Sequence, residues 1–195
     1  IKFENLLLDK NNKIKLIDKA DLNYLDSEKK RNKLSLQRIE NNNYIVNGSL
    51  FNANRLITDL LKKKEDDKKI FKNDLSLKLN LRKKFIDKKN IINDLKGKLY
   101  IKDNKLVKAN ITAFYDSNDN LTFTVNTNNG EKITTLYSSR AKPLVNRYKF
   151  IKGFKDSKEG YLDFYSSKKN GVSNSKLVID NFKVKEIPAL AKILS

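Results

Sequence analysis

The chain has 195 residues and a formal net charge of +19 at pH 7, and it contains neither cysteine nor histidine. These absences exclude disulfides, thiol chemistry and cysteine-based zinc sites, and they remove the commonest general base and metal ligand. A hydrophobic content of 38% is enough for one or two small domains with a thin core.

The first fifty residues predict β-hairpins. Residues 1–9 and 13–22 are expected to pair across a turn rich in Asp and Asn, and residues 36–41 are expected to pair with 44–51. The charged segment 27–33 between these hairpins predicts a solvated loop, with a docking patch as the alternative.

An amphipathic helix is predicted next, over residues 53–63. Asn52 or Asn54 can cap its start, its apolar residues recur at helical spacing, and the lysines at its end suit the helix dipole. The lysine-rich segment 62–69 that follows predicts a second solvated loop, again with a docking patch as the alternative.

Residues 74–137 predict an antiparallel meander with one apolar and one polar face. Apolar and polar residues alternate over 74–82, 95–103, 105–116 and 121–126, and a further strand is expected at 132–137. Such alternation is typical of an antiparallel sheet that is solvated on one side. The apolar positions proposed to line a groove are Leu75, Leu77, Leu79, Leu81, Leu99, Ile101, Ala109, Ile111, Leu121, Phe123 and Val125.

The C-terminal part predicts two more helices, near 142–150 and over 188–195. Pro188 suits the first turn of a helix, and it follows a strand that begins near residue 176. The chain begins at Ile1 and stops within the last predicted helix. We therefore expect it to be a piece of a longer protein, cut inside a structured unit. The expected fold is mainly β (α+β), a curled antiparallel sheet with about three short amphipathic helices.

The sequence contains no recognisable catalytic constellation. No two carboxylates form a recognisable catalytic pair among apolar residues. The six glycines are isolated, so no glycine-rich phosphate loop is present. Asp180 lies on an otherwise apolar strand face and is expected at its rim. Residues 116–120 lack the glycine and distal glutamate of a calcium loop and predict a turn. We therefore expect a protein that is not an enzyme and that has no cofactor and no metal site.

The positive charge has a compositional explanation. Of the 42 basic residues only six are arginine, and the lysines are spread evenly along the chain. Proteins that recognise specific bases favour arginine, and proteins that bind single strands by base stacking need clustered aromatic residues. The charge therefore predicts a solvated lysine-rich surface and no nucleic-acid partner, with a basic nucleic-acid-binding domain as an alternative.

Three segments carry a resemblance to a known family. Residues 46–57 read VNGSLFNANRLI and resemble a glycine-containing entry into a helix. Residues 136–164 resemble a helix, a glycine-containing turn and a strand. Residues 178–195 end in PALAKILS, which follows a strand. In these segments the chain resembles the C-terminal region of AsmA-like proteins of the AsmA/TamB/YhdP family, of the alphaproteobacterial type.

The resemblance implies a function in lipid transport. It implies one fragment, 1–195, of a longer β-groove protein, with hairpins in 1–51, a helix and meander in 52–137, and a helix, strands and the start of a helical segment in 138–195. The expected location is the periplasm of a Gram-negative bacterium, with an inner-membrane anchor outside this fragment. The expected partners are phospholipid acyl chains and the membrane, with other envelope proteins as further candidates. The alternatives are a closed core and an envelope-assembly scaffold without an open groove.

Overall fold

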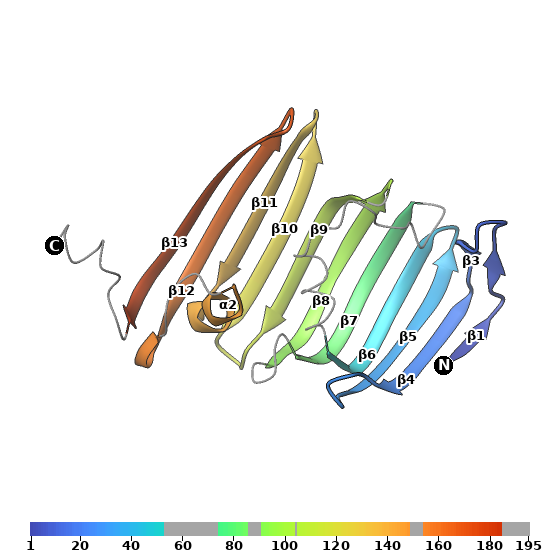
Figure 1. Cartoon of the computed structure of the whole chain (residues 1–195), viewed down its shortest axis with the longest axis horizontal. Helices are drawn as coiled ribbons and strands as arrows, with labels where there is room; N and C mark the ends of the chain where they lie inside the picture. Colours follow the sequence, from blue (N-terminus) through green and yellow to red (C-terminus); the bar gives the residue numbers. More distant parts are fainter. Residues whose placement is uncertain (53–73, 86–90, 104, 149–153, 185–195) are drawn as a thin grey trace.

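The computed structural model describes residues 1–52, 74–85, 91–103, 105–148 and 154–184, and it is mainly β, with 75% strand and 4% helix (Figure 1). The elements in chain order are β1 (Lys2–Glu4), β2 (Leu7–Leu8), β3 (Ile14–Leu16), β4 (Lys19–Leu25), β5 (Arg31–Glu40), β6 (Asn43–Asn52), β7 (Leu75–Phe85), β8 (Ile91–Lys102), β9 (Lys105–Phe114), β10 (Asn120–Asn128), β11 (Glu131–Ser138), α2 (Ala141–Tyr148), β12 (Phe154–Lys169) and β13 (Val172–Val184).

Eleven of the strands form one open sheet, and the short β2 and β3 pair separately. The order across the large sheet is β1-β4-β5-β6-β7-β8-β9-β10-β11-β12-β13, so β1 and β13 are its edges (Figure 1). This arrangement confirms the predicted mainly β fold with a large sheet that does not close. The prediction of a wholly antiparallel sheet is wrong at one place, because β6 and β7 run parallel. Parallel neighbours need a long crossover, and here it passes through residues 53–73, which lie outside the described residues.

The expectation of about three helices is not confirmed. In the part of the chain that the structure describes there is one short helix, α2, which agrees with the helix predicted near 142–150. The helices predicted over 53–63 and 188–195, and the loop over 62–69, fall outside the described residues. The loop predicted over 27–33 is shorter than expected, because β5 already begins at Arg31.

The first predicted hairpin, residues 1–9 with 13–22, is confirmed. β2 pairs with β3 next to the turn at residues 9–12, and β1 pairs with β4 farther from the turn. The second hairpin, β5 with β6, is confirmed. The Asn52 side-chain nitrogen donates hydrogen bonds to Asp26 at 2.7 Å and to Glu28 at 3.0 Å. The helix that Asn52 or Asn54 is predicted to cap lies outside the described residues.

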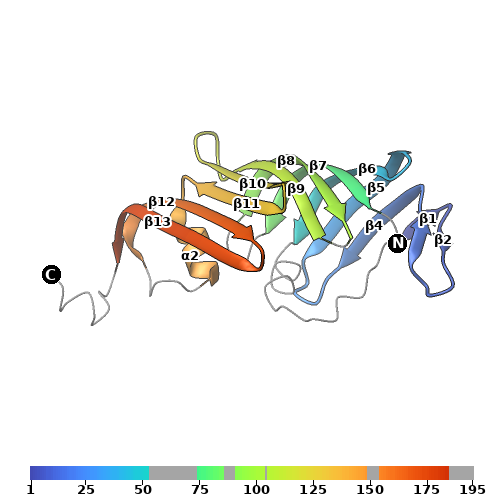
Figure 2. The same ribbon diagram turned by 90° about the horizontal axis from the view of Figure 1, so that it is seen from above.

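The two faces of the sheet differ in character, and the sheet is arched with α2 on the inside of the arch (Figure 2). We call the face that carries α2 the apolar face and the opposite one the polar face. Two groups of buried residues lie on the apolar face. One joins α2 to β8, β9, β10 and β12 through residues that include Ala113, Leu121, Val145 and Leu162. The other, near the N-terminus, contains Ile17, Ala20, Tyr44 and Leu75.

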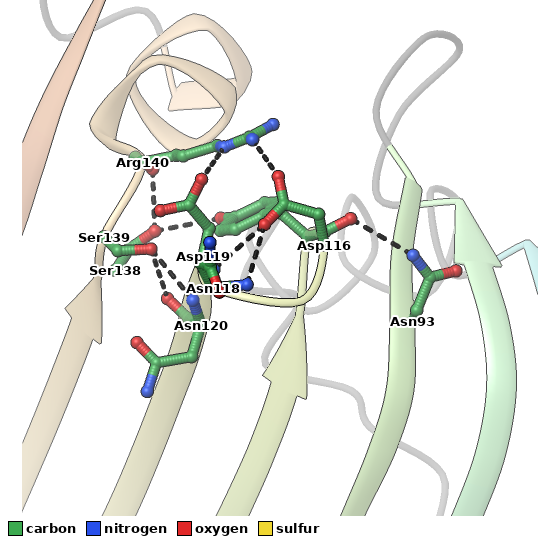
Figure 3. Close-up of polar contacts among 9 residues, drawn as sticks. Asn93, Asp116, Asn118, Asp119, Asn120, Ser138, Ser139 and Arg140 are labelled. Carbon is green, nitrogen blue, oxygen red and sulfur yellow. Dashed lines mark hydrogen bonds and ion pairs between the residues drawn. The ribbon is translucent and has the colours of Figure 1, made fainter.

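A polar network fastens the start of α2 to the turn between β9 and β10 (Figure 3). The Arg140 guanidinium donates to Asp119 at 2.6 Å and forms an ion pair with Asp116. The Asp116 carboxylate also accepts the backbone N–H groups of Asn118 and Asp119, both at 3.0 Å. These backbone hydrogen bonds, followed by the charge of Arg140, lower the pKa of Asp116. The predicted turn at 116–120 is confirmed, and its carboxylates are occupied in holding α2 in place.

A buried pair of hydroxyls continues this network into the sheet. Ser138 is fully buried, and its hydroxyl donates to the Arg140 carbonyl oxygen at 2.7 Å. The Tyr115 hydroxyl lies 2.9 Å from the Ser138 oxygen and must be the donor, because the single Ser138 proton is already used. The network therefore fixes where α2 meets the sheet and leaves the centre of the apolar face to other residues.

Candidate functional site

The eleven candidate residues lie on four adjacent strands, β7 to β10, as the predicted groove requires. Leu79 lies opposite Gly97, Gly97 opposite Ile111, and Ile111 opposite Phe123. Leu77, Leu99, Ala109 and Val125 form a parallel line beside them. The register therefore brings the candidates together on one face.

The line through Leu79 continues across the whole sheet. Every strand of the eleven contributes one residue to it, and each residue is paired in register with the next. Ten strand spacings of about 4.8 Å give this line a length of roughly 48 Å. We call it the apolar row: Phe3, Ala20, Leu36, Val46, Leu79, Gly97, Ile111, Phe123, Leu136, Phe164 and Leu177.

The candidates differ in burial. Leu75, Leu81, Ala109, Leu121 and Val125 are buried, whereas the other six are half-buried. Leu79, Leu99 and Ile111 are half-buried and belong to neither of the two core groups formed by described residues. The centre of the apolar face therefore retains solvent-accessible leucine and isoleucine between two well-packed regions.

Gly97, on the apolar row, allows β8 and β9 to approach each other closely. A Cβ atom at position 97 would lie 2.9 Å from Ile111 Cα and closer still to the Asn110 carbonyl oxygen. Both neighbours belong to the backbone of β9, which cannot move without disturbing the sheet. A side chain at this position would therefore force β8 and β9 apart, so the close approach of the strands requires glycine.

Sequence reasoning missed the two ends of the apolar row. On the N-terminal side it omitted Leu36 and Val46, and on the C-terminal side Leu136, Phe164 and Leu177. One signal for the C-terminal side was present in the dipeptide Asn170-Gly171, which forms the turn between β12 and β13 with both φ angles positive. Such a dipeptide between alternating segments marks a two-residue hairpin and fixes its register.

The polar face is basic at its centre. Lys78 lies directly opposite Lys98, and Tyr100 opposite Lys108. These residues help to line an open groove of about 800 Å³ across β5 to β10, and four of the candidates, Leu77, Leu99, Ala109 and Val125, line it as well. Because side chains alternate between the two faces along a strand, Lys78 and Lys98 themselves lie on the face opposite the candidates.

The remaining polar candidate, Asp180, lies at the rim of the sheet. It is exposed on the edge strand β13, and it accepts a hydrogen bond from the Tyr161 hydroxyl at 3.1 Å. This hydrogen bond, followed by the charge of Asp180, raises the pKa of Tyr161. The predicted rim position of Asp180 agrees with this exposure.

The remaining findings concern membrane-spanning helices and similarity to known proteins. Among the described residues, no helix combines the length and apolar character needed to cross a membrane. Comparison of the chain with protein-family models, with curated proteins and with solved structures gave no match.

Proposed function

We propose that the apolar face binds the acyl chains of phospholipids, as a non-catalytic segment of an envelope protein that carries phospholipids between two membranes. The observation that carries the proposal is the apolar row, which crosses all eleven strands and is half-buried at Leu79 and Ile111. A contiguous apolar surface that remains partly accessible to solvent is typical of a binding surface.

The energetics suit a ligand held without specific pockets. Each acyl CH₂ removed from water contributes about 0.8 kcal/mol, so several methylene groups along the apolar row are enough for binding. The proposal places the protein in the periplasm of a Gram-negative bacterium, with an inner-membrane anchor outside residues 1–195. Other envelope proteins are further candidate partners under this proposal.

The test compares two neighbouring substitutions on opposite faces. Leu79→Asp places a carboxylate on the apolar row, whereas Lys78→Asp places one on the polar face. The purified chain is incubated with vesicles of phosphatidylethanolamine and phosphatidylglycerol, separated from them, and assayed for bound lipid. We expect Leu79→Asp to lower bound lipid at least about tenfold, because lipid tails cannot solvate the charge, and Lys78→Asp to retain it. Circular dichroism checks that both variants stay folded.

Three results would contradict the proposal. The first is that the wild-type chain extracts no lipid, and the second is that both variants extract as much lipid as the wild type. The third is that Lys78→Asp loses bound lipid as completely as Leu79→Asp. An envelope-assembly scaffold without an open groove would give the first result.

A second candidate, binding of a polyanion such as nucleic acid, is favoured by the three lysines that help to line the groove across β5 to β10. We expect this binding to be weak, because the groove offers Lys78, Lys98 and Lys108 but no arginine among its described lining residues. Affinity for duplex DNA should fall steeply with salt and be lost by about 200 mM, as for contacts made only to phosphates. A filter-binding titration between 50 and 200 mM salt measures this. Sequence-selective binding that survives about 200 mM salt would promote the second candidate.

A further inference from the structure

The apolar face becomes polar toward the hairpin ends of β10 to β13. The line of Leu136, Phe164 and Leu177 is followed along the strands by a line of hydroxyls, Thr134, Ser166 and Ser175. The Ser175 hydroxyl donates to the Ser166 oxygen at 2.8 Å. Because side chains alternate between faces, these residues and the next line lie on the same face as the apolar row.

The next line holds two lysines directly opposite each other. Lys132 of β11 is paired in register with Lys168 of β12, and Thr127 of β10 is paired with Lys132 on its other side. Lys132 is half-buried, and Lys168 is exposed. Like charges directly opposite each other on neighbouring strands destabilise a sheet. Burial of Lys132, followed by the charge of Lys168, lowers the pKa of Lys132.

No negative charge within this surface offsets the pair. From Leu162 to Lys168 and along the strand segments paired with them, the described apolar-face positions of β10 to β13 contain no aspartate or glutamate. Thr127 Oγ1 is buried and has no hydrogen-bond partner in the described structure. A hydroxyl can donate one hydrogen bond, and buried polar atoms without partners are rare. Two lysines therefore lie on neighbouring strands at the polar end of an apolar surface, in one line with a buried hydroxyl.

We propose that Lys132 and Lys168 bind the phosphate of a phospholipid head group, with the acyl chains lying over the apolar row. The inference rests on the proposed function and adds the chemistry of the ligand's polar end. A phosphate accepts charge-assisted hydrogen bonds from both ammonium groups and removes the repulsion between them. The head group lies at the hydroxyl-rich end of β10 to β13, and the tails extend toward Leu136 and Phe123.

The experiment compares phosphatidic acid with diacylglycerol of the same acyl chains, because the two lipids differ only in the phosphate. Binding to the purified chain is measured by native mass spectrometry from detergent micelles. We expect the wild-type chain to bind phosphatidic acid at least about tenfold more tightly than diacylglycerol, as charge-assisted hydrogen bonds imply. The double variant Lys132→Gln with Lys168→Gln should lose this preference and keep its affinity for diacylglycerol.

A matched control removes the same charge from the other face. Lys78 and Lys98 are also directly opposite each other, and they lie on the polar face. The double variant Lys78→Gln with Lys98→Gln should retain the preference for phosphatidic acid. Equal loss in both double variants would show that net charge alone attracts the lipid, and a preference that survives in the first double variant would place the phosphate elsewhere. Either result would overturn the inference.

A titration with inorganic phosphate distinguishes a failure of this inference from a failure of the proposed function. If the wild-type chain binds neither lipid, the proposed function fails, and the anion site is then judged by amide NMR shifts during a phosphate titration. Shifts centred on Lys132 and Lys168, absent from the Lys132→Gln, Lys168→Gln variant, would support an anion site that takes free phosphate. Uniform or absent shifts would overturn it.

Discussion

Leu162→Ala is expected to lower the free energy of unfolding by about 2–5 kcal/mol, whereas Leu79→Ala is expected to lower it by about 1 kcal/mol. Leu162 is 1% exposed and belongs to the buried group that joins α2 to the sheet. Its truncation therefore leaves a cavity that the fixed position of α2 prevents from closing. Leu79 is half-buried on the apolar row, so its truncation removes less buried surface and leaves no enclosed cavity.

Urea unfolding of the two variants and the wild type, followed by circular dichroism, measures both differences. The substitution is the same in each variant, so its effect on the unfolded chain is matched. Similar losses of several kcal/mol at both positions would show that Leu79 is an ordinary core residue, which contradicts an apolar face available to ligands.

Lys84→Met is expected to stabilise the chain at pH 7 by about 1–3 kcal/mol. Lys84 is 2% exposed, and its ammonium group donates a hydrogen bond to the Leu81 carbonyl oxygen. Burial lowers the pKa of Lys84 to about 8, although the charge of Asp94 acts in the opposite direction. The folded chain at pH 7 therefore carries a buried charge that the unfolded chain keeps in water, and methionine of similar length removes this cost.

The same shift predicts how the effect depends on pH. An unfolded lysine keeps its proton up to a pKa near 10.5, whereas folded Lys84 releases it at about 8. Between these values the unfolded state binds more protons, so this group makes the wild type more stable as pH rises. The advantage of Lys84→Met should therefore shrink between pH 8 and 10.5. Lys83→Met removes an exposed charge from the neighbouring position and is the control. An advantage that stays constant over this range, or no advantage over Lys83→Met at pH 7, would contradict the buried ammonium.

The strands and faces of β7 to β10 could be predicted because their residues alternate with period two. Leu75 to Leu81 and Leu121 to Val125 occupy alternate positions with polar residues between them, so both the strand and its buried face follow from local sequence. Short turns then force these strands to pair in order. The helix at Ala141–Tyr148 was predictable for the same kind of reason, because its apolar residues recur at helical spacing.

The remaining features depend on contacts between distant residues. Nothing local in β6 or β7 specifies that the two strands pair in parallel, because alternation is the same in either direction. Apolar and polar residues alternate only weakly along β11, because Lys132 and Thr134 lie on the same face as Leu136. The contribution of β11 to the apolar face can therefore be recognised only from its register with β10 and β12.

The most direct measurement of the central claim is site-specific photocrosslinking to phospholipid. A benzophenone side chain is placed at Leu79 or Phe123 on the apolar row, and at Lys78 or Thr124 on the polar face. The chain is irradiated with phosphatidylethanolamine–phosphatidylglycerol vesicles, and lipid adducts are detected by mass spectrometry. Adducts at Leu79 and Phe123 but not at Lys78 and Thr124 are the expected result. Adducts at all four positions, or at none of them in chains that remain folded, would contradict a lipid-binding apolar face.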